Sequence, residues 1–381
     1  MSDDTQSDET IQFPPAEVRY ADELALLCSL PGGRPEGWKT TPEAVVTFIC
    51  GSDGAKVGKK KKGAPAPRAI EAKFIGDRRL VERCVVTLAG PRSLLLVGEP
   101  GTAKSMLSEL LAAAISGGSE RTVQGSAGTD EAQLRYGWNY AMLIGQGPSR
   151  DALVPSPILR CMQDGSVARI EEVTRCLSEV QDGLVSLLSE RRLTIAELGE
   201  TVYARPGFNV IATANTRDRG VSEMSAALKR RFNFEIVAPI AEFEDELDLV
   251  RRRTLATPGL IGSDGKLASA DEAVLKALVT LFRDLRYGTT EEGWAVEKPS
   301  AVMSAAEAVQ VAEGVLRTTR FFEASAAETV VGMLLGVVVK DVEDDRGRLL
   351  AYWDGVVSRR AEDQPESLWR ALHDHRGRLL S

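Results

Sequence analysis

One stretch of the sequence has the residue types of a loop that binds phosphate groups. An apolar run, Leu94–Val97, leads into this stretch, and a helical pattern follows it. The residues expected to bind the nucleotide are Gly98, Glu99, Pro100, Gly101, Thr102, Ala103, Lys104, Ser105 and Met106. In such a loop the backbone amides and the start of the following helix point at the phosphates, where the helix dipole also favours anions.

Two side chains of this loop have separate chemical roles. Lys104 is expected to reach the β- and γ-phosphate oxygens of ATP, and the Ser105 hydroxyl is expected to bind Mg²⁺. Ala103 stands where the usual pattern has glycine. The strand before the loop and the helix after it favour this interpretation over a glycine-rich turn that carries a surface lysine.

Two adjacent glutamates follow a second apolar strand pattern, Val167–Ile170. Glu171 is expected to hold the Mg²⁺ ion through its water shell, and Glu172 to orient or deprotonate the attacking water. The first acid in this role is commonly aspartate, so Glu171 is one methylene longer than usual. The alternative is that both glutamates only suit the N-terminal dipole of the helix that follows.

A third strand pattern, Phe208–Ala214, ends at Asn215. An amide at this strand tip can bond both the γ-phosphate and the water that attacks it. By itself an asparagine at a strand end is more often a turn former. Its place after the phosphate loop and the acidic strand favours the functional interpretation.

Three consecutive cations, Lys229–Arg231, end a short helical pattern. Arg231 is the first candidate, and Arg230 the second, for an arginine finger that reaches the γ-phosphate bound by a neighbouring subunit. Arg175 is a weaker candidate for a contact across the same interface. The alternative is that these cations only complement the C-terminal dipole of the helix.

The composition argues against several other kinds of chemistry. The two histidines, His373 and His375, both lie near the C-terminus, which argues against Ser-His-Asp or Cys-His nucleophiles and against histidine-rich zinc sites. The net charge of −8 argues against a nucleic-acid partner, and the longest apolar run, Val330–Val339, is too short to span a membrane. The five scattered cysteines and the acidic N-terminus predict a reduced, cytoplasmic protein.

The 381 residues suggest two or three domains. Strand and helix patterns alternate within residues 67–239, which predicts an α/β domain with a parallel sheet. The expected strands are Ser93–Val97, Ser166–Ile170 and Phe208–Ala214, and the expected helices are Asp77–Leu88, Ser105–Ile115 and Ser178–Ser189. Residues 240–381 predict an all-helical domain and a C-terminal tail. The helices expected there are Phe243–Leu255, Asp271–Leu285, Ala301–Leu316 and Glu323–Val339.

Residues 1–66 have a different composition. An acidic tail, 1–12, is expected to be disordered, and two short helices are expected between Pro15 and Cys50. The segment Gly51–Pro67 has the composition of a linker and contains the basic run Lys59–Lys62. The sequence leaves open whether the short helices dock a partner or pack on the following domain.

The order of these motifs resembles the MoxR family of AAA+ ATPases. The resemblance covers about residues 70–340 and depends on Gly98–Ser105, on Glu171 and Glu172 followed by Thr174 and Arg175, on Ala212–Asn215 and on Arg231–Phe232. The amino-acid sequences of Glu179–Glu190 and Ala212–Gly220 are most similar to the YehL branch. The resemblance implies a P-loop AAA+ core followed by a helical lid, an insert at Gln124–Pro157 and a β-hairpin within Arg192–Phe208.

The same resemblance implies an activity and partners. It implies ATP and Mg²⁺ as cofactors, a homo-hexameric ring that shares ATP sites between subunits, and the remodelling or maturation of a protein client. A partner with a von Willebrand factor A domain often accompanies such proteins. At the place of the usual sensor-2 arginine this chain has Ser300, with Lys298 as a substitute candidate. An ATP-dependent assembly scaffold with slow turnover and a DNA-associated motor are the alternative functions.

Overall fold

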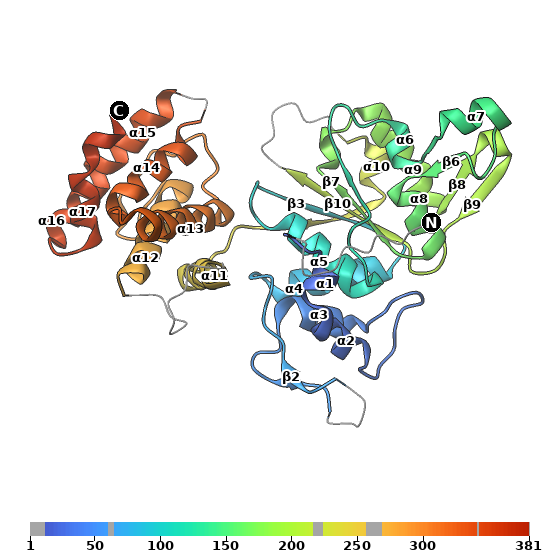
Figure 1. The fold of residues 1–381 in the computed structure, drawn as a ribbon, viewed down its shortest axis with the longest axis horizontal. Helices are drawn as coiled ribbons and strands as arrows, with labels where there is room; N and C mark the ends of the chain where they lie inside the picture. The colour runs from blue at the N-terminus through green and yellow to red at the C-terminus, as the bar shows by residue number, and fades with distance from the viewer. Residues whose placement is uncertain (1–11, 60–64, 216–223, 257–268, 341–342, 381) are drawn as a thin grey trace. The chain divides into compact units, whose positions relative to one another are not determined.

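The computed structural model describes residues 12–59, 65–215, 224–256, 269–340 and 343–380 (Figure 1). They form two compact units. One lies within residues 1–98 and 103–237, and the other within residues 238–381, to which the tetrapeptide Glu99–Thr102 is assigned. Within the described ranges, no helix combines the length and the apolar character needed to cross a membrane.

A sheet of five parallel strands forms the centre of the first unit, in the order β11-β3-β10-β7-β4. The strands are β3 (Ser93–Gly98), β4 (Thr122–Gln124), β7 (Val167–Glu171), β10 (Asn209–Asn215) and β11 (Phe232–Ile236). The three central strands are almost wholly buried, as strands covered on both faces are. The predicted parallel α/β fold is confirmed, and the structure adds the two edge strands β4 and β11.

Helices cover both faces of this sheet. On one face, Leu94 and Leu96 of β3 share a core with α4 (Arg78–Ala89) and α5 (Lys104–Ser116). On the other face, Leu95 packs in a core to which α8 (Pro157–Asp164) and α9 (Ser178–Glu190) contribute. Successive residues of a strand point to opposite faces, which explains this division.

The N-terminal helices pack on the α4–α5 face. They are α1 (Ala16–Arg19), α2 (Ala21–Cys28) and α3 (Pro42–Cys50). Val45, Phe48 and Ile49 of α3 are fully buried in the same core as α4 and α5. Of the two alternatives left open by the sequence, these helices therefore pack on the core, and the described part of residues 12–66 belongs to the first unit.

Part of the predicted linker has regular structure. β1 (Lys56–Val57) pairs antiparallel with β2 (Arg68–Ala69), so the two ends of Gly51–Pro67 are held together. Lys59 is exposed, whereas the other three lysines of the basic run lie outside the described residues. The predicted acidic tail also lies outside them, except for Gln12.

The insert and the hairpin implied by the family resemblance are both present. The insert contains α6 (Glu131–Leu134), β5 (Tyr136–Trp138), α7 (Tyr140–Gln146) and β6 (Leu153–Pro155), and β5 pairs antiparallel with β6. The hairpin consists of β8 (Arg192–Ile195) and β9 (Glu200–Tyr203). Glu197, at the tip of the hairpin, accepts hydrogen bonds from Tyr136 and Trp138, so the insert is tied to the hairpin.

The described part of the second unit is helical, with one isolated bridge between Thr289 and Ala295. Its longer helices are α11 (Phe243–Ala256), α12 (Ser269–Tyr287), α13 (Ala305–Phe322) and α14 (Ala326–Val338), which share one core. The sequence predicts that the third of these helices begins at Ala301. It begins at Ala305, because Ser304 caps α13 by accepting a hydrogen bond from the backbone amide of Glu307.

The C-terminal residues are not a tail. They form α15 (Glu343–Tyr352), a π-helical turn, η4 (Trp353–Val357), and the helices α16 (Ser358–Asp363) and α17 (Leu368–Asp374). Trp353, Leu372 and Leu379 are fully buried in the core of the second unit. The sequence prediction missed these elements because each helix is short and carries many charged residues, which hides its apolar stripe.

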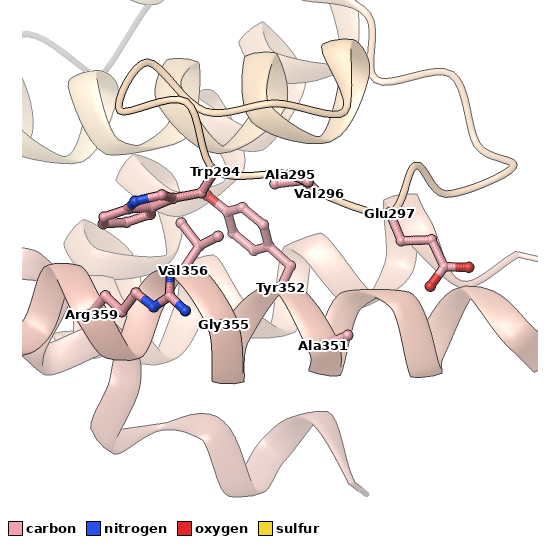
Figure 2. A pocket seen from close by; sticks show the side chains of 9 residues that line it. All are labelled: Trp294, Ala295, Val296, Glu297, Ala351, Tyr352, Gly355, Val356 and Arg359. Atoms are coloured by element: carbon pink, nitrogen blue, oxygen red, sulfur yellow. The ribbon is translucent and has the colours of Figure 1, made fainter.

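A groove of about 530 Å³ lies on the second unit between the loop Trp294–Glu297 and the helical segment from Ala351 to Arg359 (Figure 2). The Arg359 guanidinium lies over the Trp294 ring, 5.2 Å from its centroid. Glu297 lies at the opposite end of the groove (Figure 2). The groove therefore has a cation at one end, a carboxylate at the other and apolar side chains such as Val356 between them.

A buried ion network holds the second unit together. Arg360, 4% exposed, donates to the Asp284 carboxylate at 2.7 Å and to Glu292 at 2.8 Å. The Tyr352 hydroxyl donates to the same Asp284 oxygen at 2.8 Å. Removing Arg360 would leave Asp284, 3% exposed, without its cation.

Arg360→Met is therefore expected to lower the free energy of unfolding of the helical unit by about 3–5 kcal/mol. Urea unfolding followed by circular dichroism measures this change. Arg370→Met is the matched control, because Arg370 makes an exposed i,i+4 ion pair with Asp374. The control is expected to cost about 0.5 kcal/mol or less. Equal losses in the two variants would contradict the role of the network.

Candidate nucleotide site

The segment Glu99–Ala103 joins the end of β3 to the start of α5. Gly101 has φ +76° and Ala103 has φ +65°, and both values lie in the left-handed region that favours glycine. Ala103, where the pattern usually has glycine, thus keeps the glycine conformation at a cost of about 1–2 kcal/mol. Lys104 is 6% exposed, and its Nζ donates to the Gly98 carbonyl at 3.1 Å. The ammonium group is therefore held against the end of β3.

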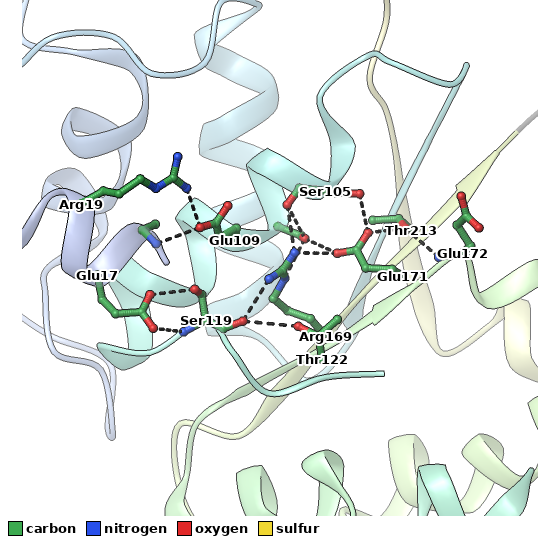
Figure 3. A network of polar contacts seen from close by, with 12 residues as sticks. Glu17, Arg19, Ser105, Glu109, Ser119, Thr122, Arg169, Glu171, Glu172 and Thr213 are labelled. Atoms are coloured by element: carbon green, nitrogen blue, oxygen red, sulfur yellow. Dashed lines mark hydrogen bonds and ion pairs between the residues drawn. The ribbon is translucent and has the colours of Figure 1, made fainter. Parts of the chain in front are cut away.

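Ser105 in the first turn of α5 contacts the acid at the end of β7. Its hydroxyl donates to Glu171 Oε2 at 2.6 Å, and the hydroxyl of Thr213 donates to the same oxygen at 2.8 Å. The other oxygen, Oε1, accepts from Ser108 at 2.7 Å and from Arg169 at 2.8 Å. The two residues predicted to hold Mg²⁺ are therefore brought together directly (Figure 3).

The surroundings keep Glu171 ionised although it is buried. Burial acts to raise its pKa, but the hydrogen bonds from Ser105 and Ser108, the charge of Arg169 and the bond from Thr213 together hold the pKa of Glu171 below its usual value. A buried carboxylate beside a serine hydroxyl supplies the oxygen ligands that Mg²⁺ takes in proteins.

Glu172 has φ +54°, which turns its side chain away from that of Glu171. Its Oε1 accepts from the Asn215 amide at 3.3 Å. Its Oε2 accepts from the Gln124 amide at 3.3 Å and pairs with Arg175 Nε at 3.0 Å. The predicted base and the predicted water-binding amide are thus in contact.

Strand register brings these residues to one edge of the sheet. Asn215 pairs with Gly98, where the phosphate loop begins, and Ala212 pairs with Ile170, next to Glu171. All of these strands are parallel, so their carboxyl ends meet at the same edge. The three strand tips that carry the loop, the acids and the amide therefore lie side by side.

Arg230 and Arg231 lie at the opposite edge. Phe232 pairs with Ser93, and the Ser93 amide donates to the Arg231 carbonyl at 3.0 Å. The length of β3 from Ser93 to Gly98 is about 16 Å, which is beyond the reach of a guanidinium. Arg231 Nε donates to the Ser189 hydroxyl on α9, and Arg230 is exposed. Neither arginine is therefore part of the cluster around Glu171.

Comparison with known proteins identifies the family. A model of the AAA domain of the dynein-related subfamily matches residues 93–232, and a model of the YehL-like AAA+ ATPase C-terminal domain matches residues 244–380. Over 375 residues the chain is 47% identical to the uncharacterized protein YehL of Escherichia coli strain K12, with 97% of this chain and 98% of that protein covered. This chain is a YehL-like AAA+ ATPase. The predicted resemblance to the YehL branch is confirmed.

More distant proteins are also similar. The uncharacterized protein SH1500 of Staphylococcus haemolyticus is 27% identical over 198 residues, which cover 51% of this chain and 68% of that one. Among solved structures, NtrX from Brucella abortus has 16% identity and a TM-score of 0.45, with 80% of this chain and 69% of NtrX covered. The RuvB branch migration motor of Thermotoga maritima has 15% identity and a TM-score of 0.43, with 77% and 84% covered.

In this YehL-like ATPase, sequence reasoning missed four side chains around the two glutamates. They are Ser108, Gln124, Arg169 and Thr213. Arg169 has a recognisable signal, because a charged residue interrupts the apolar pattern of a buried strand. Thr213 also lies in an apolar strand. Threonine is common in strands, so its presence there does not indicate a contact with Glu171.

The helical unit of the YehL-like ATPase uses Ser300 for a structural contact. The Ser300 amide donates to Asp345 Oδ1 at 2.9 Å, and its hydroxyl donates to Oδ2 of the same carboxylate. Lys298 is exposed. A Cβ built on Gly288, which has φ +74°, would lie 2.7 Å from Cε of Lys298, so the lysine stem lies over this glycine. Ser300 thus ties the loop before α13 to α15.

Proposed function

We propose that this YehL-like ATPase hydrolyses ATP in the presence of Mg²⁺ and uses the energy to remodel or mature a protein client. The observation that carries the proposal is the 2.6 Å contact between the Ser105 hydroxyl and Glu171, in the turn that follows Lys104. A serine hydroxyl, a carboxylate and a lysine at the end of a glycine loop form the donor set that a magnesium triphosphate needs.

Each residue has a separate role in this proposal. Lys104 leaves the Gly98 carbonyl and binds the β- and γ-phosphate oxygens. Ser105 and Glu171 hold Mg²⁺, which when bound neutralises charge that develops on the phosphate oxygens. Asn215 orients the attacking water, and Glu172 accepts its proton. Because Glu172 is paired with Arg175, this ion pair has to open before the carboxylate can take the proton.

Completion of the site requires a second subunit. A cation at the amino edge of the sheet is too far from its own phosphate loop, so we assign Arg231, with Arg230 as second candidate, to the γ-phosphate of a neighbour. We further propose the homo-hexameric ring that such sharing allows, a partner with a von Willebrand factor A domain and a cytoplasmic location. The acidic net charge of −8 supports a protein client over nucleic acid.

A slow-turnover assembly scaffold is the second candidate. The contacts of Glu172 with Arg175 and Gln124 favour it, because both partners bond Oε2, and an oxygen already bonded to both is not free to contact the attacking water. In a scaffold these contacts would persist when ATP is bound. In a remodelling ATPase they would open when the ring closes around the nucleotide.

The turnover rate per subunit, measured across protein concentration, separates the two candidates. The ATPase predicts a rate that rises with assembly, whereas a flat and very low rate supports the scaffold. Lys104→Ala is expected to weaken ATP binding by about 10–100-fold, because it removes the charge-assisted contact to the phosphates. Lys56→Ala, at an exposed position on β1, is the matched control and should bind ATP normally. Tight ATP binding by Lys104→Ala would overturn the role of the loop.

A further inference from the structure

A charged side chain lies in the middle of β7, inside the first unit. Arg169 is 12% exposed, and a guanidinium is costly to remove from water. An apolar residue at this position would extend the core at no such cost. The contacts of the guanidinium must therefore offset the cost of burying it.

The Arg169 guanidinium contacts the Glu171 carboxylate and backbone groups near both ends of α5 (Figure 3). Its Nε donates to the Ser108 hydroxyl at 2.9 Å, and its Nη2 donates to the Ser105 carbonyl at 3.1 Å. The same Nη2 donates to Glu171 Oε1 at 2.8 Å. Nη1 donates to the Ser119 carbonyl, at 2.9 Å, beyond the end of α5. One guanidinium thus connects the metal-side acid to both ends of the helix that carries Ser105.

The contacts divide the two oxygens of Glu171. Oε1 is occupied by Arg169 and Ser108, both of which are fixed in the core. Oε2 accepts from Ser105 and Thr213, so it is the oxygen on the side of the proposed metal position. A glutamate has one more rotatable bond than the aspartate usual at this place, and its carboxylate can take more positions. Fixing Oε1 removes this freedom.

We propose that Arg169 is a positioning residue that holds the longer Glu171 carboxylate, and the Ser105 turn beside it, in the geometry required by Mg²⁺. The inference depends on the proposed function, in which Ser105 and Glu171 hold the ion. In this role Arg169 acts through Glu171 and Ser105 and needs no contact of its own with the metal or the nucleotide. Mg²⁺ demands near-ideal octahedral geometry, so a free glutamate would bind it poorly, and loss of an outer-shell partner typically costs about 10–100-fold in metal affinity.

Arg169→Met tests the proposal through metal binding and not through turnover. Mn²⁺ affinity in the presence of ADP is measured by electron paramagnetic resonance, and Mg²⁺ affinity by competition. We expect the dissociation constant of the metal to rise about 10–100-fold, with ADP binding in EDTA unchanged. Ser108→Ala removes one donor to Glu171 and leaves the buried arginine in place. This variant should also raise the dissociation constant of the metal, so the test stays decisive if Arg169→Met does not fold.

Arg191→Met is the matched control. The Arg191 guanidinium is also partly buried and also bonds backbone carbonyls, those of Pro91 and Phe208, but at the opposite edge of the sheet. The metal affinity of Arg191→Met should equal that of the unmodified chain. A change of less than about threefold in both Arg169→Met and Ser108→Ala, or an equal loss in Arg191→Met, would overturn the inference. If the unmodified chain binds no metal with ADP, the proposed function itself fails.

Discussion

Glu172→Gln is expected to bind ATP as tightly as the unmodified chain and to hydrolyse it about 10²–10⁴-fold more slowly. The amide has the shape of the carboxylate but cannot accept a proton from water. Lys104, Ser105 and Glu171 remain in place, so the groups proposed to bind the phosphates and the metal are unchanged. Binding is measured with a fluorescent ATP analogue, and hydrolysis by single-turnover release of phosphate.

Glu43→Gln, an exposed change on α3, is the matched control and should leave both measurements unchanged. The predicted combination of intact binding and lost hydrolysis distinguishes a general base from a residue that only orders the site. If Glu172→Gln turned over ATP at the normal rate, the base would have to be another group. If it lost ATP binding as well, the ion pair with Arg175 would be structural and not catalytic.

Arg231→Ala is expected to lower turnover about 10³–10⁵-fold at protein concentrations where the chain assembles, with ATP binding by each subunit intact. The reason is distance, because Arg231 lies at the amino edge of the sheet and its own phosphate loop lies at the carboxyl edge. A guanidinium there can act only on a nucleotide held by another subunit. Turnover and assembly are measured on the same samples, the latter by light scattering.

Lys229→Ala tests the alternative interpretation of the same cations. Lys229 lies in the last turn of α10 (Ala226–Lys229) and complements the helix dipole as Arg231 would. Its loss is expected to change turnover by no more than about fivefold, because a helix-dipole contact is worth only about 0.3–1 kcal/mol. Comparable losses in Lys229→Ala and Arg231→Ala would favour the dipole interpretation. If Arg230→Ala lost turnover and Arg231→Ala turned over ATP at the normal rate, Arg230 would be the arginine finger.

The sequence was sufficient to predict that the strand tips, with the side chains proposed to bind the nucleotide and metal, meet at one edge of the sheet. Gly98, Lys104, Glu171, Glu172 and Asn215 follow strand patterns in chain order, and parallel strands bring their tips to one edge whatever their lateral order. The helical unit was also predictable, because its long helices have clear apolar periodicity.

The supporting residues could not be predicted in the same way. Ser108 becomes a partner of Arg169 and of Glu171 only when β7 lies beside α5, a contact between segments about 60 residues apart in the chain. Nothing local to Val167–Glu171 specifies that neighbour. The packing of α3 on the core likewise depends on a tertiary contact, because its apolar pattern would suit a partner surface equally well.

Mixing two inactive variants tests most directly whether neighbouring subunits share the ATP site. Glu172→Gln keeps the proposed finger, and Arg231→Ala keeps the proposed base, so an interface with the base from one variant and the finger from the other would be complete. In a random equal mixture about a quarter of the head-to-tail interfaces are complete, and turnover should recover to about that fraction of the normal rate. Mixed assemblies that form but stay as inactive as either variant alone would contradict the account.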